Sequence, residues 1–436
     1  MSETQSEFQN GPLKQPLNHA SAVSGPDCVK AEPLAEVTPL DGQNRDVNSG
    51  ADLECPNRAV TTAEQTADPP AGFKPVTAAG ANGSRFVRAC LRLPVDRTPV
   101  WFLRQAGRYM PEYMAVRKHH SLLDICRTPD IAAEVTITAA ERLGVDAAII
   151  FADLLLPFTP MGLDFEFVAN EGPIVHAPIR TAAQARALRT DSTDDLRYVA
   201  RAIEQVAAHF NARPRTGAGA SEPDTLGIIG FCGAPFTLAS YMIEGASSRN
   251  YIETKRLMYG DGEAWPILME KLITVLADFA AQQVEAGADV IQVFDSWVGA
   301  LSPTDYRQYV LAPTTELIRR IQALGVPVIY FGVDTASLLP AMRETGADVR
   351  GLDWRTPLDQ AWRALNYSTA VQGNLDPIPL FAPERVLHAR VAEILAAAAG
   401  RPGHIFNLGH GIVPTTPVEA VLQVVHQIKQ SALEPG

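Results

Sequence analysis

The stretch that decides the fold spans residues 267 to 296 and reads ILMEKLITVLADFAAQQVEAGADVIQVFDS. From Ile267 to Ala286 apolar residues recur at the 3–4-residue spacing of an amphipathic helix, and Gly287 marks its end. The run Val290–Phe294 is short, apolar and typical of a buried parallel strand. Asp295 and Ser296 follow it directly. The stretch therefore predicts a helix, then a strand, with polar side chains at the strand's carboxyl end.

The same alternation continues in both directions along the chain. Eight runs are predicted as strands: Val100–Leu103, Ala147–Phe151, Leu226–Phe231, Val290–Phe294, Val326–Phe331, Val349–Leu352, Ala370–Gln372 and His404–Leu408. Helical patterns lie between most of them, so the fold class is α/β, and the expected architecture is a single (β/α)8 TIM barrel. A doubly wound open sheet is the alternative. Residues 152–225 form an elaborated connection after the second strand, with a hairpin at Asp164–Val175 and two helical stretches.

Residues 1–84 differ in composition from the rest of the chain. They hold eleven acidic and five basic residues and only two aromatic residues, Phe8 and Phe73. Such a segment buries too little apolar surface to offset its ordering entropy, so we expect a disordered N-terminal extension. The catalytic domain is expected to be a barrel over residues 85–432.

Composition excludes several classes of protein. The net charge of −12 and the lack of a basic stripe argue against nucleic-acid binding. The apolar runs are too short to insert into a membrane, and no secretory signal precedes them. The five cysteines, none paired at close spacing, favour reduced thiols in a cytoplasmic protein over a disulfide framework or a zinc knuckle.

Polar residues follow nearly every predicted strand. They include Arg104, Gln105, Arg108, Asp153, Tyr241, Asp295, Ser296, Asp353, Asn374 and His410. A single aspartate at a strand end is more often a helix cap than a catalytic group. In a barrel, however, all these ends meet at one mouth, where catalytic residues gather.

The loop after the first predicted strand reads Arg104-Gln105-Ala106-Gly107-Arg108-Tyr109. A guanidinium binds both oxygens of a carboxylate at once, so Arg104, Arg108 and the later Arg117 are candidates for an anion site. Gly107 permits a tight bend. The alternative is that these arginines pair with local acids such as Glu112 or Asp124.

Several blocks resemble the uroporphyrinogen decarboxylase family. The segment from Pro99 to Tyr113, PVWFLRQAGRYMPEY, is similar to the family's N-terminal signature, and the segment from Gly230 to Gly245, GFCGAPFTLASYMIEG, to its second. Shorter blocks follow in the same order: Phe151–Asp153, Phe294–Trp297, Gln372–Asp376 and Asn407–Gly411. The resemblance spans residues 86–430 and leaves the N-terminal extension unaccounted for.

The resemblance implies a cofactor-free, metal-free homodimer that converts uroporphyrinogen III to coproporphyrinogen III and CO2 in haem biosynthesis. It implies catalytic roles for Asp153, Arg104, Tyr241 and His410. Substrate contacts are implied for Arg104, Gln105, Ala106, Gly107, Arg108, Arg117, Asp153, Phe231, Tyr241, Phe294, Ser296 and His410, with the two phenylalanines flanking the macrocycle. Trp297 and Arg355 receive no predicted role.

The expected chemistry uses the substrate's own pyrrole ring, protonated on carbon, as the electron sink. Asp153 is predicted to stabilise the resulting cation, while the arginines hold acid arms. The proton donor stays open: Arg104 is too weak an acid, whereas His410 titrates in a suitable range and Tyr241 could relay a proton.

Two other functions compete with this interpretation. A zinc methyltransferase of the same superfamily would need a His-x-Cys pair, and none of the nine histidines has cysteine two residues later. A porphyrinogen-binding protein without activity is the second alternative, and the presence of both Asp153 and the arginine loop disfavours it.

Overall fold

A computed structural model describes residues 84–168, 171–211, 225–260 and 262–431. The predicted disordered extension, residues 1–84, lies outside this range except for Ser84. None of the helices in the described residues is long and apolar enough to cross a membrane.

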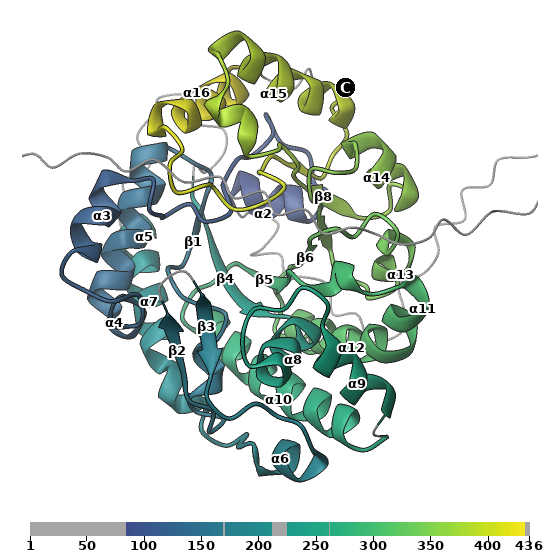
Figure 1. Cartoon of the computed structure of the whole chain (residues 1–436). Helices are drawn as coiled ribbons and strands as arrows, with labels where there is room; N and C mark the ends of the chain where they lie inside the picture. Colours follow the sequence, from purple (N-terminus) through teal and green to yellow (C-terminus); the bar gives the residue numbers. More distant parts are fainter. Residues whose placement is uncertain (1–83, 169–170, 212–224, 261, 432–436) are drawn as a thin grey trace, which may run out of the picture. The chain divides into compact units, whose positions relative to one another are not determined.

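The core of the fold is a seven-stranded sheet in the order β1-β4-β5-β6-β7-β8-β9, with every neighbouring pair parallel. Its strands are β1 (Ala147–Ile149), β4 (Gly227–Gly233), β5 (Val290–Asp295), β6 (Val328–Gly332), β7 (Val349–Gly351), β8 (Ala370–Gln372) and β9 (His404–Ile405). The sheet curls, and helices cover its outer face (Figure 1). The predicted α/β class with parallel strands is therefore confirmed.

The helices that follow and precede these strands have the following bounds. They are α2 (Arg85–Cys90), α3 (Pro111–Arg117), α4 (Leu122–Arg127), α5 (Pro129–Leu143), α8 (Pro235–Glu244), α9 (Ile252–Gly260), α10 (Ala264–Glu285), α11 (Pro303–Asp305), α12 (Leu311–Gln322), α13 (Leu339–Arg343), α14 (Leu358–Ala364), α15 (Glu384–Ala398) and α16 (Val418–Gln430). Short 3-10 helices are η3 (Val298–Ala300) and η5 (Ile378–Phe381), and η4 (Tyr306–Val310) is a π-helix. The helix predicted from Ile267 to Ala286 is α10, which begins three residues earlier.

The first predicted strand, Val100–Leu103, is wrong as a strand. Only an isolated parallel bridge joins Val100 to Phe406. The reason is that side chains take over the ladder positions: the N–H of Leu103 donates to Asn407 Oδ1 at 2.9 Å, and that of Phe102 to Gln105 Oε1 at 3.3 Å. A barrel closed by eight strands is therefore not confirmed, and the established architecture is the curled seven-stranded sheet.

The segment nevertheless lies between the two edge strands of the sheet. On one side the N–H of Phe406 donates to the Pro99 carbonyl at 2.8 Å. On the other side the N–H of Asp146 donates to the Val100 carbonyl, also at 2.8 Å. The backbone before the arginine loop is thereby fixed from both edges.

The elaborated connection after β1 is confirmed. It contains the 3-10 helix η1 (Leu156–Phe158), an antiparallel hairpin of β2 (Phe165–Val168) and β3 (Gly172–Val175), α6 (Ala182–Ala187), η2 (Thr193–Leu196) and α7 (Arg197–Asn211). Helix α7 packs against α5 and α10 through its buried face, which includes Val199, Ile203 and Val206. The insertion is thus built into the helical layer.

Three connections into strands share the sequence Gly-x-Asp, at residues 144–146, 287–289 and 346–348. The glycines have positive φ angles of 64°, 110° and 75°, which allow the chain to leave the preceding helix. The three aspartates each accept a backbone N–H of the neighbouring segment at 2.8 Å, from Val100, Ile228 and Val328 respectively. The side chains of these three aspartates therefore link neighbouring segments through hydrogen bonds at the amino-terminal ends of the strands.

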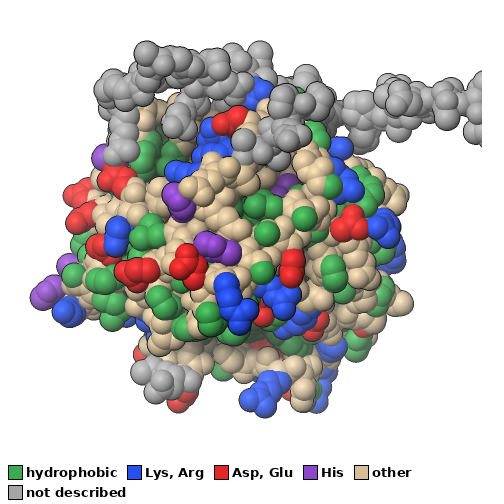
Figure 2. Space-filling view, turned by 90° about the horizontal axis from the view of Figure 1, so that it is seen from above, with side chains coloured by type: hydrophobic (Ala, Val, Ile, Leu, Met, Phe, Trp, Pro, Cys, Tyr) green, Lys and Arg blue, Asp and Glu red, His purple; other side chains and the backbone are tan. Residues whose placement is uncertain are grey.

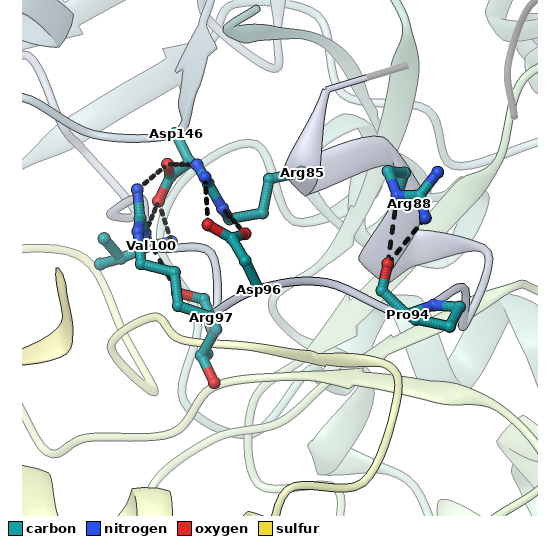
Figure 3. A network of polar contacts seen from close by, with 8 residues as sticks. Arg85, Arg88, Pro94, Asp96, Arg97, Val100 and Asp146 are labelled. Carbon is teal, nitrogen blue, oxygen red and sulfur yellow. Dashed lines mark hydrogen bonds and ion pairs between the residues drawn. The ribbon is translucent and has the colours of Figure 1, made fainter. Parts of the chain in front are cut away.

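Among the described residues, Asp146 accepts more hydrogen bonds than Asp289 or Asp348. Figure 3 shows the contacts of Asp146. Arg97 donates to both of its oxygens, at 2.7 and 2.6 Å, and Arg85 donates to Oδ1 at 3.1 Å. Arg85 also pairs with the more exposed Asp96. One buried carboxylate thus joins α2, the segment before the arginine loop and β1.

Candidate active site

The arginine loop starts at Arg104, whose φ of 61° turns the chain sharply after Leu103. Arg104 and Arg108 are exposed. Among the described residues neither forms an ion pair: Glu112 pairs with Arg142 at 3.4 Å, and Asp124 caps its own helix through Ser121. The alternative that these arginines neutralise Glu112 or Asp124 is therefore wrong, and their guanidinium groups are available to an anion.

The loop is held from beneath by Gln105. Its side-chain amide donates to the Ala147 carbonyl at 3.2 Å, and its backbone carbonyl accepts the Tyr109 hydroxyl at 2.7 Å. Ala106 packs against the core, and a side chain at Gly107 would lie 3.1 Å from the Arg104 carbonyl. The buried Gln105 side chain therefore supports the loop, while its two arginines face outward.

Asp153 follows β1 and is half-buried. Its Oδ1 accepts the N–H of Leu155 at 2.9 Å. Burial raises the pKa of Asp153, and the Leu155 N–H and the positive charge of Arg104 oppose that rise. The positive charge of Arg104 therefore acts on the carboxyl group of Asp153.

Tyr241 in α8 lies in the same field. Burial and the neighbouring Asp153 raise the pKa of Tyr241 to about 12, and Arg104 acts in the opposite direction. Its ring packs on Trp297, with ring centroids 3.8 Å apart and planes inclined by 36°. The phenol is therefore neutral at physiological pH and can donate a hydrogen bond.

His410 is on the last connection, beside the arginine loop. The Arg104 side chain lies directly on the next residue, since a Cβ on Gly411 would be 2.5 Å from Arg104 Cδ. The His410 ring meets Trp354 edge-on, with centroids 5.9 Å apart. Burial and then the charge of Arg104 lower the pKa of His410, so its imidazole is neutral near pH 7.

Phe231 and Phe294 lie near the carboxyl ends of the neighbouring strands β4 and β5. Their ring centroids are 5.5 Å apart and their planes nearly perpendicular. Phe294 contacts Phe331 of β6 in the same edge-on way, at 5.9 Å. These rings give adjacent strands a continuous apolar surface, with Phe294 the more exposed of the predicted pair.

Two residues predicted to bind substrate, Ser296 and Arg117, form no hydrogen bond or ion pair with Arg104, Asp153, Tyr241 or His410 among the described residues. Ser296 is half-buried directly after β5, and its hydroxyl has no hydrogen bond to the described residues. Arg117 donates to the His120 carbonyl, and its charge lies near Tyr113, on the α3 side of the loop. The structure therefore groups Arg104 with Asp153, Tyr241 and His410, but engages Arg117 elsewhere.

Asp295, also at the end of β5, is fully buried. Its carboxylate accepts the Thr237 hydroxyl at 2.7 Å and the Tyr330 hydroxyl at 2.6 Å. The Tyr330 hydroxyl lies 3.2 Å from that of Tyr306 in the π-helix η4. Burial raises the pKa of Asp295 to about 6 in spite of these bonds. Asp295 therefore belongs to the interior of the fold.

The raised pKa of Asp295 predicts a pH-dependent stability. A carboxyl group that holds its proton more tightly in the folded chain contributes stability below about pH 4, and this is lost as pH rises through about 6. Wild type should lose on the order of 3 kcal/mol relative to Asp295→Asn across that window. Urea unfolding of both proteins at several pH values measures the difference. A difference that does not change with pH would contradict the expectation.

Three residues beside the site are not recognisable from strand-end polarity. Trp297 packs on Tyr241, Trp354 meets His410, and Arg355 stacks over Trp354 with its guanidinium carbon 4.1 Å from the ring centroid. Arg355 also pairs with Asp353 at 3.3 Å. What these three residues share in the sequence is their position. Trp297 directly follows Ser296, and Trp354 and Arg355 directly follow Asp353.

The described residues contain no group of three or more His, Cys, Asp or Glu side chains arranged to hold a metal ion. On the face shown in Figure 2, acidic, basic and histidine side chains are interspersed. The negative net charge of the chain is therefore not gathered on that face.

Known proteins resemble this chain in sequence and in fold. The uroporphyrinogen decarboxylase (URO-D) family model matches residues 82–431. A uroporphyrinogen decarboxylase of Koribacter versatilis is 59% identical over 81% of this chain and 99% of its own length, and one of Solibacter usitatus is 51% identical over 80% and 97%. A methyltransferase from Methanosarcina mazei shares the fold with a TM-score of 0.65 at 19% identity, over 79% of this chain and 97% of its own. The chain belongs to the uroporphyrinogen decarboxylase family.

Proposed function

We propose that this chain decarboxylates uroporphyrinogen III, removing its four acetate carboxyl groups to give coproporphyrinogen III and CO2. One observation carries the proposal: Arg104, unpaired among the described residues, lies against Gly411 beside His410, and its charge also reaches Asp153 and Tyr241. A polyanionic tetrapyrrole needs such a combination of a cation, a carboxylate and neutral hydrogen-bond donors.

Arg104 and Arg108 would bind carboxylate arms of the substrate. Planar guanidinium groups bind carboxylates through two parallel hydrogen bonds. Their charge also offsets the repulsion that a protein of net charge −12 exerts on a polyanion. Phe231 and Phe294 would supply the apolar surface on which the macrocycle rests.

Asp153 would stabilise the cation that forms during the reaction. A proton added to the ring carbon next to the acetate-bearing carbon leaves a positive charge conjugated with the bond to be broken. As CO2 departs, the electron pair of the broken carbon–carbon bond neutralises the ring and forms an exocyclic methylene. Protonation of this methylene gives the methyl group, and the ring carbon releases its proton. A carboxylate near the pyrrole N–H groups lowers the energy of the cation throughout.

Tyr241 and His410 would act as neutral hydrogen-bonding groups. The pKa of Tyr241, about 12, and the lowered pKa of His410 make both poor sources of a proton near pH 7. Both side chains can still orient an acid arm or a water molecule that delivers the proton. Ser296, half-buried beside Trp297, would add a further contact to the substrate.

We also infer a homodimer that works in the cytoplasm without metal or organic cofactor, and a barrel completed by residues 99–103. The family resemblance supports the first three statements. The hydrogen bonds of this segment to Phe406 and Asp146 support the fourth.

Anaerobic incubation with uroporphyrinogen III, followed by separation of the products by carboxyl number, tests the proposed function. The expected result is a shift from eight carboxyl groups to four, with intermediates of seven, six and five. Substrate that binds but keeps all eight groups would identify a binding protein without activity. Decarboxylation should persist after exhaustive treatment with a metal chelator.

Substitution of Arg108 should weaken substrate binding. Arg108→Gln removes one charge-assisted contact, so KM should rise by roughly tenfold while kcat changes little. Steady-state kinetics at two salt concentrations measures this. The matched control is Arg363→Gln, because Arg363 is an exposed arginine of α14 that pairs with Asp359 away from the site. Equal KM values for Arg108→Gln and wild type would remove Arg108 from the substrate site.

A further inference from the structure

The loop after β5 contacts α8 at two points one helical turn apart. Thr237 and Tyr241 are four residues apart and therefore lie on the same face of α8. The backbone N–H of Trp297 donates to Thr237 Oγ1 at 3.2 Å. The Trp297 ring packs on Tyr241 with a centroid distance of 3.8 Å. One residue of the loop thus meets both the polar and the aromatic side chain.

The polar contact is anchored in the interior of the fold. Thr237 Oγ1 accepts from Trp297 and donates to the buried Asp295, which also accepts from Tyr330. A buried hydroxyl with both its donor and its acceptor function satisfied has a fixed orientation. The backbone of Trp297 therefore has little freedom to move relative to α8.

The Tyr241 hydroxyl, in contrast, has no hydrogen-bond partner among the described residues, so packing of its ring determines where it lies. The Trp297 ring packs directly against the Tyr241 ring. The same indole also contacts Tyr251, with centroids 5.2 Å apart. The indole consequently fixes the Tyr241 ring from outside the helix.

We propose that Trp297 is a positioning residue, which acts by holding the Tyr241 hydroxyl where the substrate needs it. This inference rests on the proposed function, because it requires Tyr241 to contact the substrate. Trp297 itself is anchored through Thr237 to Asp295. Loss of the indole leaves the phenol intact but free to rotate away.

The test measures kcat for Trp297→Leu in two backgrounds, wild type and Tyr241→Phe. An aromatic pair contributes enough free energy to change a rate by roughly five- to tenfold, so kcat should fall by about that factor when Tyr241 is present. In the Tyr241→Phe background the hydroxyl is already absent, and the further loss should be under about twofold. Trp297→Phe keeps a ring on Tyr241 and should restore kcat to within about threefold of wild type.

A matched control separates positioning from general damage. Trp265→Leu alters a buried tryptophan of α10 whose indole N–H donates to the Tyr309 carbonyl. It should lower the midpoint of thermal unfolding without changing kcat per folded molecule. If Trp297→Leu does not fold, Thr237→Val replaces it, because it removes the anchor of Trp297, and Thr237→Ser should restore activity.

Two results would overturn the inference. One is an equal fall in kcat for Trp297→Leu, or for Thr237→Val in its place, in both backgrounds. The other is a Tyr241→Phe protein with the kcat of wild type. A wild-type chain that leaves all eight carboxyl groups in place would instead refute the proposed function, so the two failures are distinguishable.

Discussion

We expect Asp153→Asn to keep the fold and to lower kcat by about 10²–10³-fold. The asparagine carbonyl can still accept the Leu155 N–H that Asp153 accepts at 2.9 Å, so the local turn is retained. The substitution removes the negative charge that would stabilise the protonated pyrrole, and a preorganised group of this kind typically contributes a factor of that size. Product analysis by carboxyl number, with circular dichroism to verify folding, measures both parts of the result.

Asp348→Asn is the matched control for this experiment. Asp348 is also half-buried, its pKa is also raised by burial, and it also accepts a backbone N–H, from Val328 at 2.8 Å. It differs in lying at the amino-terminal end of a strand, away from the site. The kcat of the Asp348→Asn variant should equal that of wild type. A folded Asp153→Asn protein with near-normal turnover would exclude the electrostatic role of Asp153.

Asp146→Ala should destabilise the fold by about 3–5 kcal/mol, the cost of removing one partner from a buried ion pair. The substitution leaves the Arg97 guanidinium, bonded to both carboxylate oxygens, without its partner. It also leaves the Val100 N–H without its acceptor. The free energy of unfolding in urea, extrapolated to water, measures the loss.

Asp96→Ala provides the comparison, since Asp96 pairs with Arg85 at the surface with 63% of its side chain exposed. Exposed pairs contribute about 0–1 kcal/mol, so this variant should be nearly as stable as wild type. Similar losses for the two variants would show that burial of Asp146 does not determine the strength of the network in Figure 3.

The regular part of the fold could be predicted from local sequence. The helix and strand of residues 267–296 appear as α10 and β5, because periodicity, a terminating glycine and a buried apolar run all indicate the same structure. The segment Val100–Leu103 was misassigned because distant residues decide it. The partner of the Leu103 N–H is Asn407, which is 304 residues away and carries no local signal.

The sequence predicts which side chains follow the strands, but not how these side chains are oriented. Arg104, Asp153 and His410 are expected at one mouth because parallel strands bring their carboxyl ends to one edge, whereas Tyr241 lies further along the chain, within α8. The inward turn of Gln105 toward Ala147 depends on backbone geometry that no periodicity encodes. Trp297 received no predicted role because an aromatic residue after a strand usually indicates packing, and only its distance to Tyr241 gives it another meaning.

The Gly-x-Asp connections have a consequence for how such a protein can be altered. They fix the strand register at the amino-terminal ends of the strands, opposite the loops that carry the candidate site. The hydrogen bonds involved include no residue of those loops. Insertions or deletions in the loops at the carboxyl ends of the strands should therefore leave this register intact, except beside Asp295, where they would break its buried hydrogen bonds with Thr237 and Tyr330. At the three Gly-x-Asp turns, in contrast, libraries selected for expression alone should retain the glycine and a side chain that can accept the backbone N–H.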